Sequence, residues 1–140
     1  MGCNIRKNVI IYNPGYIEHL ECVDMRELVK ASKALSDEVR VRMLKLLLEK
    51  DICVCEMQEI FPQSESQVSR NLKMLTEAGF LSRWREGKCV VYMADRVKSN
   101  PFCRALLDFL AASFNDDEVV GRDRERLREV VKQQMRARNR

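Results

Sequence analysis

The amino-acid sequence predicts a mainly α-helical protein that carries one short β-hairpin. Its 140 residues include only five glycines and three prolines, too few turn formers for a many-stranded sandwich or barrel. Apolar residues make up 46% and charged residues 33%, a balance that supports a buried core and argues against general disorder. Because a domain typically needs about 100–150 residues, the length allows one domain with short extensions.

Helical periodicity begins after residue 23. The first 23 residues show no clear helical period and are expected to form an N-terminal arm. Asp24 is predicted to cap a first helix whose apolar side reaches Leu35. Ser36 is predicted to cap a second helix with Met43 on its buried stripe. The basic residues of that second helix are expected to stay in solvent: Arg40, Arg42 and Lys45.

Two short helices follow, separated by a tight connection. The third is predicted over roughly 54–60, and Pro62 ends it. Ser64 and Gln67 have the spacing of a capping box, in which each side chain bonds the other residue's backbone N–H. The fourth helix begins there and runs to about Ala78, where Gly79 is predicted to end it in the left-handed conformation.

A hairpin and two more helical segments complete the chain. Segments 80–85 and 88–94 are β-prone, with Glu86-Gly87 predicted as the turn between them. Pro101 is predicted to open a fifth helix. Its expected apolar face comprises Leu106, Leu107, Leu110 and Phe114. We therefore divide the chain into an arm (1–23), a domain with dimerisation helices (24–115) and a charged helical tail (116–140).

The order of these elements predicts a winged helix-turn-helix that binds DNA. The fourth helix carries small polar and basic groups opposite its apolar stripe, as a helix that enters the major groove must. Basic residues flank the hairpin turn, from which they can reach phosphates or the minor groove. A charged face alone is typical of an ordinary solvated helix, so the DNA-binding prediction depends on the order of these elements. The predicted DNA-binding residues are Ser64, Ser66, Gln67, Ser69, Arg70, Asn71, Lys73, Arg83, Arg85 and Lys88.

Six cysteines and a single histidine limit the chemistry of any ligand site. No apolar run is long enough for a membrane span or a signal peptide, so we expect a cytoplasmic protein without a membrane partner. In that reducing compartment, thiols suggest metal binding, redox sensing or buried packing. Since His19 is the one histidine and is expected at the surface, any metal must be held by sulfur.

Four blocks of sequence, in this order, resemble the ArsR/SmtB family of repressors. They are ALSDEVRVRML at 34–44, SESQVSRNL at 64–72, EAGFL at 77–81 and REGK at 85–88. The resemblance covers about residues 30–115. It implies a dimeric winged-helix repressor of double-stranded operator DNA, with the first and fifth helices at the dimer interface. Asn71 stands where the family often has histidine, a departure that would alter operator preference.

The run Cys53-Val54-Cys55 resembles the Cys-Val-Cys metal box on the third helix of the family's arsenite- and cadmium-sensing branches. Alone, such cysteines are often small buried residues, but this pair immediately precedes the predicted DNA-reading helix. Residues two apart on a helix point about 200° from each other. Binding one ion must therefore unwind the first helical turn or capture it already unwound.

The third thiol ligand is expected to be Cys22, which lies on the arm just before the first helix. Gln58 stands where one branch of the family has its third cysteine. Weaker candidates are Cys3 and Cys103, whereas Cys89 is expected to be structural on its strand. Since As(III) and Sb(III) prefer three thiolates, we expect one of them as the inducer, with Cd(II) or Pb(II) as alternatives and no permanent cofactor.

The leading hypothesis is thus a metalloid-responsive repressor that leaves its operator when Cys53 and Cys55 bind the inducer. A thiol redox switch on the same fold is the first alternative. A thiol enzyme or metal carrier is least favoured, because no histidine lies nearby in the sequence to act as a base and no glycine loop is present to cradle phosphate.

Overall fold

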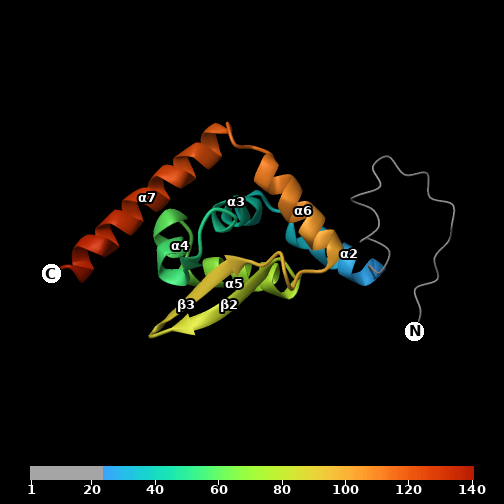
Figure 1. Cartoon of the computed structure of the whole chain (residues 1–140), viewed down its shortest axis with the longest axis horizontal. Helices are drawn as coiled ribbons and strands as arrows, with labels where there is room; N and C mark the ends of the chain where they lie inside the picture. The colour runs from blue at the N-terminus through green and yellow to red at the C-terminus, as the bar shows by residue number, and fades with distance from the viewer. Residues whose placement is uncertain (1–23) are drawn as a thin grey trace.

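A computed structural model of the chain describes residues 24–140. The predicted arm, with Cys3, His19 and Cys22, lies outside the described residues. Among those that are described, no helix has both the length and the apolar character needed to cross a membrane. The elements in order are α2 (Met25–Ala34), α3 (Glu38–Leu47), β1 (Ile52–Cys53), α4 (Val54–Ile60), α5 (Glu65–Glu77), β2 (Leu81–Glu86), β3 (Cys89–Ala94), α6 (Pro101–Ala112) and α7 (Glu118–Arg138) (Figure 1).

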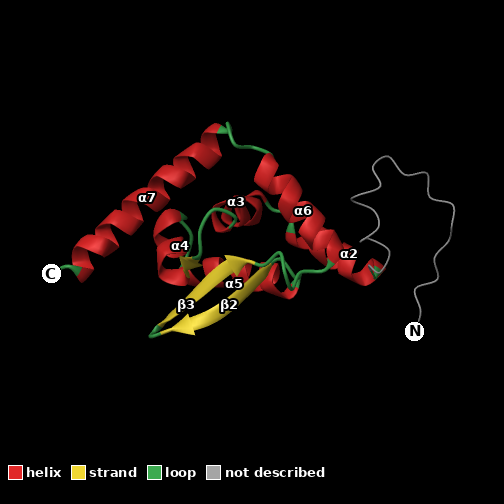
Figure 2. Ribbon diagram, in the orientation of Figure 1, coloured by secondary structure: helices red, strands yellow, loops and turns green. Residues whose placement is uncertain are grey.

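One apolar core joins the helices to the small sheet. Phe61, Phe80 and Met43 are among its largest fully buried side chains. Leu107 of α6 and Leu127 of α7 belong to the same core. Figure 2 shows α6 and α7 diverging from their short connection. The β2–β3 hairpin lies on the opposite side of α3 and α4 from that connection. The winged helix-turn-helix expected from the sequence is confirmed.

Helix α5 has the boundaries that the sequence predicts. The Ser64 hydroxyl accepts from the Gln67 backbone N–H, and the Gln67 side chain accepts from the Ser64 N–H, both at 3.3 Å. After α5, Gly79 has a φ of 97°, the left-handed conformation that glycine adopts without a steric penalty. Buried Val68 and Leu72 turn the polar residues of α5 outward.

The N-cap of α3 is Asp37, so the prediction of Ser36 is wrong by one residue. The Asp37 carboxylate accepts from the backbone N–H groups of Val39 and Arg40 at 2.8 and 3.2 Å. A carboxylate also complements the positive end of the helix dipole, which a hydroxyl does not. The Ser36 hydroxyl instead donates to the Lys33 carbonyl at the end of α2, at 2.7 Å.

The hairpin turn also lies one residue later than predicted. Glu86 pairs with Cys89 across the hairpin, so Gly87 and Lys88 form the two-residue loop. Gly87 has a φ of 62°. A glycine at the first loop position permits the backbone twist that matches the two strands, which explains why the turn begins there.

Two basic residues of α3 are buried, contrary to expectation. Lys45 is only 2% exposed, and its Nζ donates to the carbonyls of Leu110 and Ser113 at 2.7 and 2.6 Å. The Leu110 carbonyl also accepts from the Ser113 N–H at 3.3 Å, and Ser113 is the C-cap of α6, so the ammonium group adds a charged donor at the C-terminal end of that helix. Arg40 acts similarly on α2, donating through Nε to the Ala34 carbonyl at 2.6 Å. Their hydrogen bonds offset the cost of burying charge.

Helix α7 is joined to α3 by an ion pair. Arg42, the remaining basic residue of α3, donates from Nε and Nη2 to the two carboxylate oxygens of Asp123, at 2.7 and 2.8 Å. Its guanidinium carbon also lies 5.2 Å from the centre of the Phe61 ring. Phe114 is not on the α6 face as predicted: α6 ends at Ala112, and Phe114 has a φ of 60° and is half exposed.

A two-residue strand, β1, connects the segment before α4 to the hairpin. It pairs antiparallel with β3, with Ile52 opposite Tyr92 and Cys53 opposite Val91. The sheet order is β1-β3-β2. A strand this short has no detectable period in the sequence and was not predicted from it. Its pairing positions the candidate ligand site.

Candidate functional site

Three cysteine thiols gather beside the hairpin: Cys53, Cys55 and Cys89. Their Sγ atoms all lie within 4.8 Å of one another. The Sγ atoms of Cys55 and Cys89 are 3.5 Å apart. Cys53 and Cys89 are partly buried and Cys55 is exposed, so the cluster is open to solvent on one side. We refer to these three residues as the thiol cluster.

Cys53 and Cys55 converge without any unwinding of α4. Cys53 is the N-cap, with an extended backbone (φ −79°, ψ 155°), and Cys55 lies in the first turn. The Glu56 carboxylate accepts from the Cys53 N–H at 2.8 Å and stabilises this geometry. Because Cys53 stands outside the helix, the 200° separation expected within a helix does not apply. The sequence allowed two arrangements, a first turn that unwinds on binding and a first turn that is already unwound at Cys53. The structure has the second.

The pairing of β1 with β3 brings Cys89 to the same place. Cys53 is opposite Val91, and residues two apart on a strand point to the same face of the sheet. Cys89 therefore shares a face with Val91 and Cys53. The alternation of residues along its strand predicted a structural Cys89. Such an alternation does not show which residues lie on the neighbouring strand. Only the unpredicted β1–β3 register could have revealed this neighbour.

Cys103, the other candidate thiol among the described residues, is not part of the cluster. Cys103 is fully buried at the start of α6, and its Sγ donates to the Ala78 carbonyl at 3.3 Å. Burial raises the pKa of Cys103 to about 11. These contacts are those of a packed residue between α5 and α6. Cys22 and Cys3 lie outside the described residues.

Two thiols of the cluster, Cys53 and Cys55, have raised pKa values. The hydrogen bond with Cys89 raises the pKa of Cys55 to about 11, assisted by desolvation and by the nearby Cys53 thiol. Desolvation also raises the pKa of Cys53. A soft cation would replace these protons, and it would stabilise three thiolates that otherwise repel one another.

A groove of about 540 Å³ surrounds the thiol cluster. Trp84 and Lys88 of the hairpin line one side, and Gln134 and Arg138 of α7 line another. Lys50, just before β1, is the third positive charge of the lining, and the carboxylates of Asp51, Glu56 and Glu86 balance these three charges. The groove is large enough to admit a hydrated ion or a small oxyacid, so the thiols are accessible to a ligand from solution.

Nearly all the predicted DNA-binding side chains are on exposed surface. On β2, Arg83 and Arg85 alternate with Trp84 and so share one face of the hairpin. Asn71 differs: it is partly buried, its Oδ1 accepts from Arg40 at 3.3 Å, and its Nδ2 donates to Gln63 at 3.2 Å. The exposed members of the predicted set are Ser64, Ser66, Gln67, Ser69, Arg70, Lys73, Arg83, Arg85 and Lys88.

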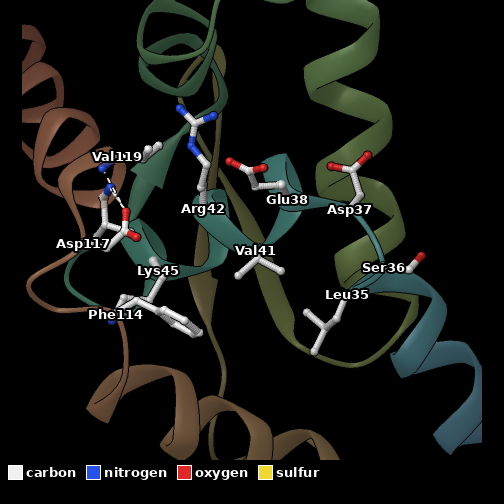
Figure 3. A pocket seen from close by; sticks show the side chains of 11 residues that line it. Leu35, Ser36, Asp37, Glu38, Val41, Arg42, Lys45, Phe114, Asp117 and Val119 are labelled. Carbon is white, nitrogen blue, oxygen red and sulfur yellow. Dashed lines mark hydrogen bonds between the residues drawn. The ribbon is translucent and has the colours of Figure 1, made fainter.

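A second cavity, of about 460 Å³, lies between α3 and the α6–α7 connection (Figure 3). Most of its charged residues already have structural roles. Asp37 and Asp117 cap α3 and α7, and Lys45 caps the end of α6. Leu35 and Phe114 supply much of its apolar wall. The cavity is therefore a junction between elements, and no cysteine lines it.

Comparison with known proteins identifies the central part of the chain. Residues 37–83, from the N-cap of α3 into β2, match the family described as "Bacterial regulatory protein, arsR family". The matched segment contains the Cys-Val-Cys run and all of α5.

Several curated relatives match the same region. The cadmium resistance transcriptional regulatory protein CadC homolog of Staphylococcus aureus is 37% identical over 70 residues, 49% of this chain and 58% of that protein. The arsenic resistance transcriptional regulator ArsR1 of Pseudomonas putida is 41% identical over 61 residues, 43% of this chain and 48% of that protein. The chain thus spans about half the length of these two relatives. A transcriptional repressor SmtB homolog of Synechocystis is 30% identical over 89 residues, 63% of this chain and 67% of that protein.

Solved structures agree with the fold. The transcriptional repressor BigR from Xylella fastidiosa superposes with a TM-score of 0.54 at 25% identity, over 66% of this chain and 88% of that one. Three findings therefore agree: the order of the elements, the matching family segment and the SmtB homolog, which is aligned over two thirds of its length. The chain belongs to the ArsR family of bacterial regulatory proteins.

Proposed function

We propose that this protein is a metalloid-responsive transcriptional repressor. It binds operator DNA as a homodimer in the cytoplasm and is released when As(III) or Sb(III) binds Cys53 and Cys55. The observation that carries this proposal is the convergence of the two thiols at the start of α4, the helix immediately before α5. The relatives named for arsenic and cadmium resistance support a thiol-seeking ligand, and Cd(II) or Pb(II) is the alternative.

Helix α5 and the hairpin supply the proposed DNA surface. Gln67 and Arg70 extend from the N-terminal half of α5, the part of a recognition helix that reads base edges. The hairpin arginines, Arg83 and Arg85, are positioned to contact phosphates beside the groove. Asn71 is engaged with Arg40 and Gln63, so we assign it to the support of α5 rather than to base contacts.

Helix α4 provides the link between ligand and DNA. Its buried Met57 and Ile60 belong to the core that also holds Val68 and Leu72 of α5. A ligand that favours one position of the Cys53–Cys55 segment therefore favours one position of α5. Release requires only that the ligand bind the two positions with different affinity, and such coupling is typically about 1–3 kcal/mol.

The homodimer is proposed to form through α2 and α6. Met25 and Val29 on α2 are 76% and 46% exposed, and Phe109 on α6 is 57% exposed. Large apolar side chains grouped on two helices are typical of a protein interface. A two-fold dimer would present two α5 helices to two half-sites of an operator.

The test is arsenite-induced release of operator DNA, followed by fluorescence anisotropy under strict reduction. Wild type is expected to release the DNA, whereas Cys53→Ser and Cys55→Ser are expected to bind it with nearly unchanged affinity and not to respond. Neither thiol is on the exposed DNA-reading face of α5, so DNA affinity serves as the control for folding. Release of both variants at the wild-type arsenite concentration would refute the proposal.

A redox switch is the second candidate, favoured by the 3.5 Å separation of the Cys55 and Cys89 sulfurs. The two thiols would give two electrons and two protons to a peroxide, and an S–S bond would form. Hydrogen peroxide would become two waters, and an alkyl hydroperoxide would become an alcohol and one water. Peroxide without arsenite would then release the DNA, and arsenite under reduction would not. The same anisotropy assay separates the two candidates.

A further inference from the structure

We infer that the third thiolate ligand is Cys89, on strand β3 of the hairpin, so that one chain holds arsenite with Cys53, Cys55 and Cys89. This inference rests on the proposed function and names the ligand that completes its site. The sequence predicts Cys22 for this role, but Cys89 already lies beside the Cys-Val-Cys pair.

The sulfur separations suit a single small ion. A thiolate lies about 2.3 Å from such an ion, so two sulfurs on one ion are at most about 4.6 Å apart and about 3.8 Å apart at tetrahedral angles. The Cys55 and Cys89 sulfurs are 3.5 Å apart, and no pair in the cluster exceeds 4.8 Å. Side-chain adjustments of a few tenths of an ångström to about one ångström therefore suffice for all three to bind.

The backbone holds the three thiols in place before any ligand arrives. Cys53 is paired with β3 through Val91, Cys89 is paired with Glu86 of β2, and Cys55 is in the first turn of α4. None of these three thiols is held in place by a long loop. A site built from paired strands and a helix start loses little conformational freedom on binding, which favours affinity.

The reaction requires no oxidant. Arsenite enters as As(OH)₃, and each thiol proton leaves with one hydroxide as water, so three As–S bonds replace three As–O bonds and arsenic stays trivalent. The product is uncharged, which suits a partly buried site. The groove bounded by Trp84 and Lys88 admits As(OH)₃ and allows the water to leave.

Coordination by Cys89 would connect the ligand directly to the hairpin as well as to α4. Cys89 follows Lys88 of the turn and pairs across the hairpin with Glu86, next to Arg85. Both proposed DNA-contacting elements would then respond to one bound arsenic atom. A ligand set completed from the N-terminal arm would not join α4 to the hairpin through the bound atom.

The experiment compares the full-length wild type with Cys89→Ser and with the double variant Cys3→Ser/Cys22→Ser. Arsenic X-ray absorption is expected to show three sulfur neighbours in wild type and in the double variant, but two sulfurs and one oxygen in Cys89→Ser. Arsenite needed for half-release should rise roughly tenfold or more in Cys89→Ser alone, since even outer-shell changes at metal sites cost 10–100-fold.

Operator affinity without arsenite verifies that each variant is folded, and Cys89→Ala replaces Cys89→Ser if the serine is not tolerated. Three sulfurs retained in the Cys89 variant would overturn the inference and move the ligand to another thiol. That result would leave the proposed function intact, because Cys53→Ser and Cys55→Ser would still abolish release. Only a wild-type response in those two variants refutes the function itself.

Discussion

Single residues explain why a chain so rich in charge can bury several charged groups. Lys45 joins α3 to the end of α6 through the Leu110 and Ser113 carbonyls, and its Asn115 contact, at 3.0 Å, fixes the connection to α7. Desolvation lowers the pKa of Lys45, as expected for a buried ammonium group. Its three hydrogen bonds use every donor of the ammonium group, which is why burial is tolerated.

Lys45→Met is expected to lower the free energy of unfolding by about 1–3 kcal/mol. The methionine fills a similar volume but cannot donate to the Leu110 and Ser113 carbonyls, and losing hydrogen bonds from a charged donor costs about that much. Urea denaturation measures the change. The matched control is Lys132→Met on α7, whose side chain is 64% exposed and which should be within about 0.5 kcal/mol of wild type. Equal stability of the two variants would show that the Lys45 contacts are dispensable.

At the scale of elements, α5 and the hairpin are proposed to contact DNA in different ways. The buried stripe of α5 and the capping box at Ser64 orient its polar face outward. The two-residue loop at Gly87 places Arg83 and Arg85 along one edge of the β2–β3 ribbon. The helix can therefore read base edges while the hairpin contacts the backbone.

Arg70→Ala is expected to weaken operator binding by roughly 1–3 kcal/mol and to relax specificity, if a base edge is its partner. Arg85→Ala should weaken operator and random DNA about equally and reduce the salt dependence by about one unit of slope, as loss of a phosphate contact does. Anisotropy titrations at several salt concentrations measure both. Arg128→Ala, on the exposed side of α7, controls for the loss of one positive charge.

Wild-type operator affinity in both Arg70→Ala and Arg85→Ala would locate the DNA surface elsewhere. A loss of affinity that is identical on operator and random DNA in Arg70→Ala would instead make that residue a phosphate contact. The two variants thus test the proposed division of labour between α5 and the hairpin.

At the scale of the whole molecule, α2 and α6 leave apolar side chains in solvent at one end of the fold, on the right of Figure 1. Phe109 and Phe114 also contact each other edge to face, with ring centres 6.5 Å apart. A second copy is the occupant we propose for this surface, because two-fold symmetry covers both helices at once.

Val29→Glu/Phe109→Glu is expected to convert the dimer to a monomer and to lower operator affinity by at least about tenfold, since two half-sites are no longer bound together. Analytical ultracentrifugation measures the first effect and anisotropy the second. Met135→Glu is the control, because Met135 is 60% exposed on α7, away from both helices. A dimer that persists in the double variant would place the interface on another surface.

Local signals predicted most of the fold because they act over a few residues. The Ser64–Gln67 box, the left-handed Gly79 and Pro101 at the first turn of α6 each depend on neighbours in sequence. Where two capping residues stood next to each other, at Ser36 and Asp37, the choice depended on which backbone groups each side chain reached, and the prediction was wrong.

The sequence by itself determined the winged helix-turn-helix, the outward polar face of α5 and the Cys53–Cys55 pair before it. Tertiary structure alone decided the burial of Lys45, the engagement of Asn71 with Arg40 and the position of Cys89 beside the pair. The physical reason is that caps and apolar periods involve residues within one or two turns. A two-residue strand and a buried ammonium group instead depend on partners that are 38 and 65 residues away in the chain, at Cys53–Val91 and Lys45–Leu110.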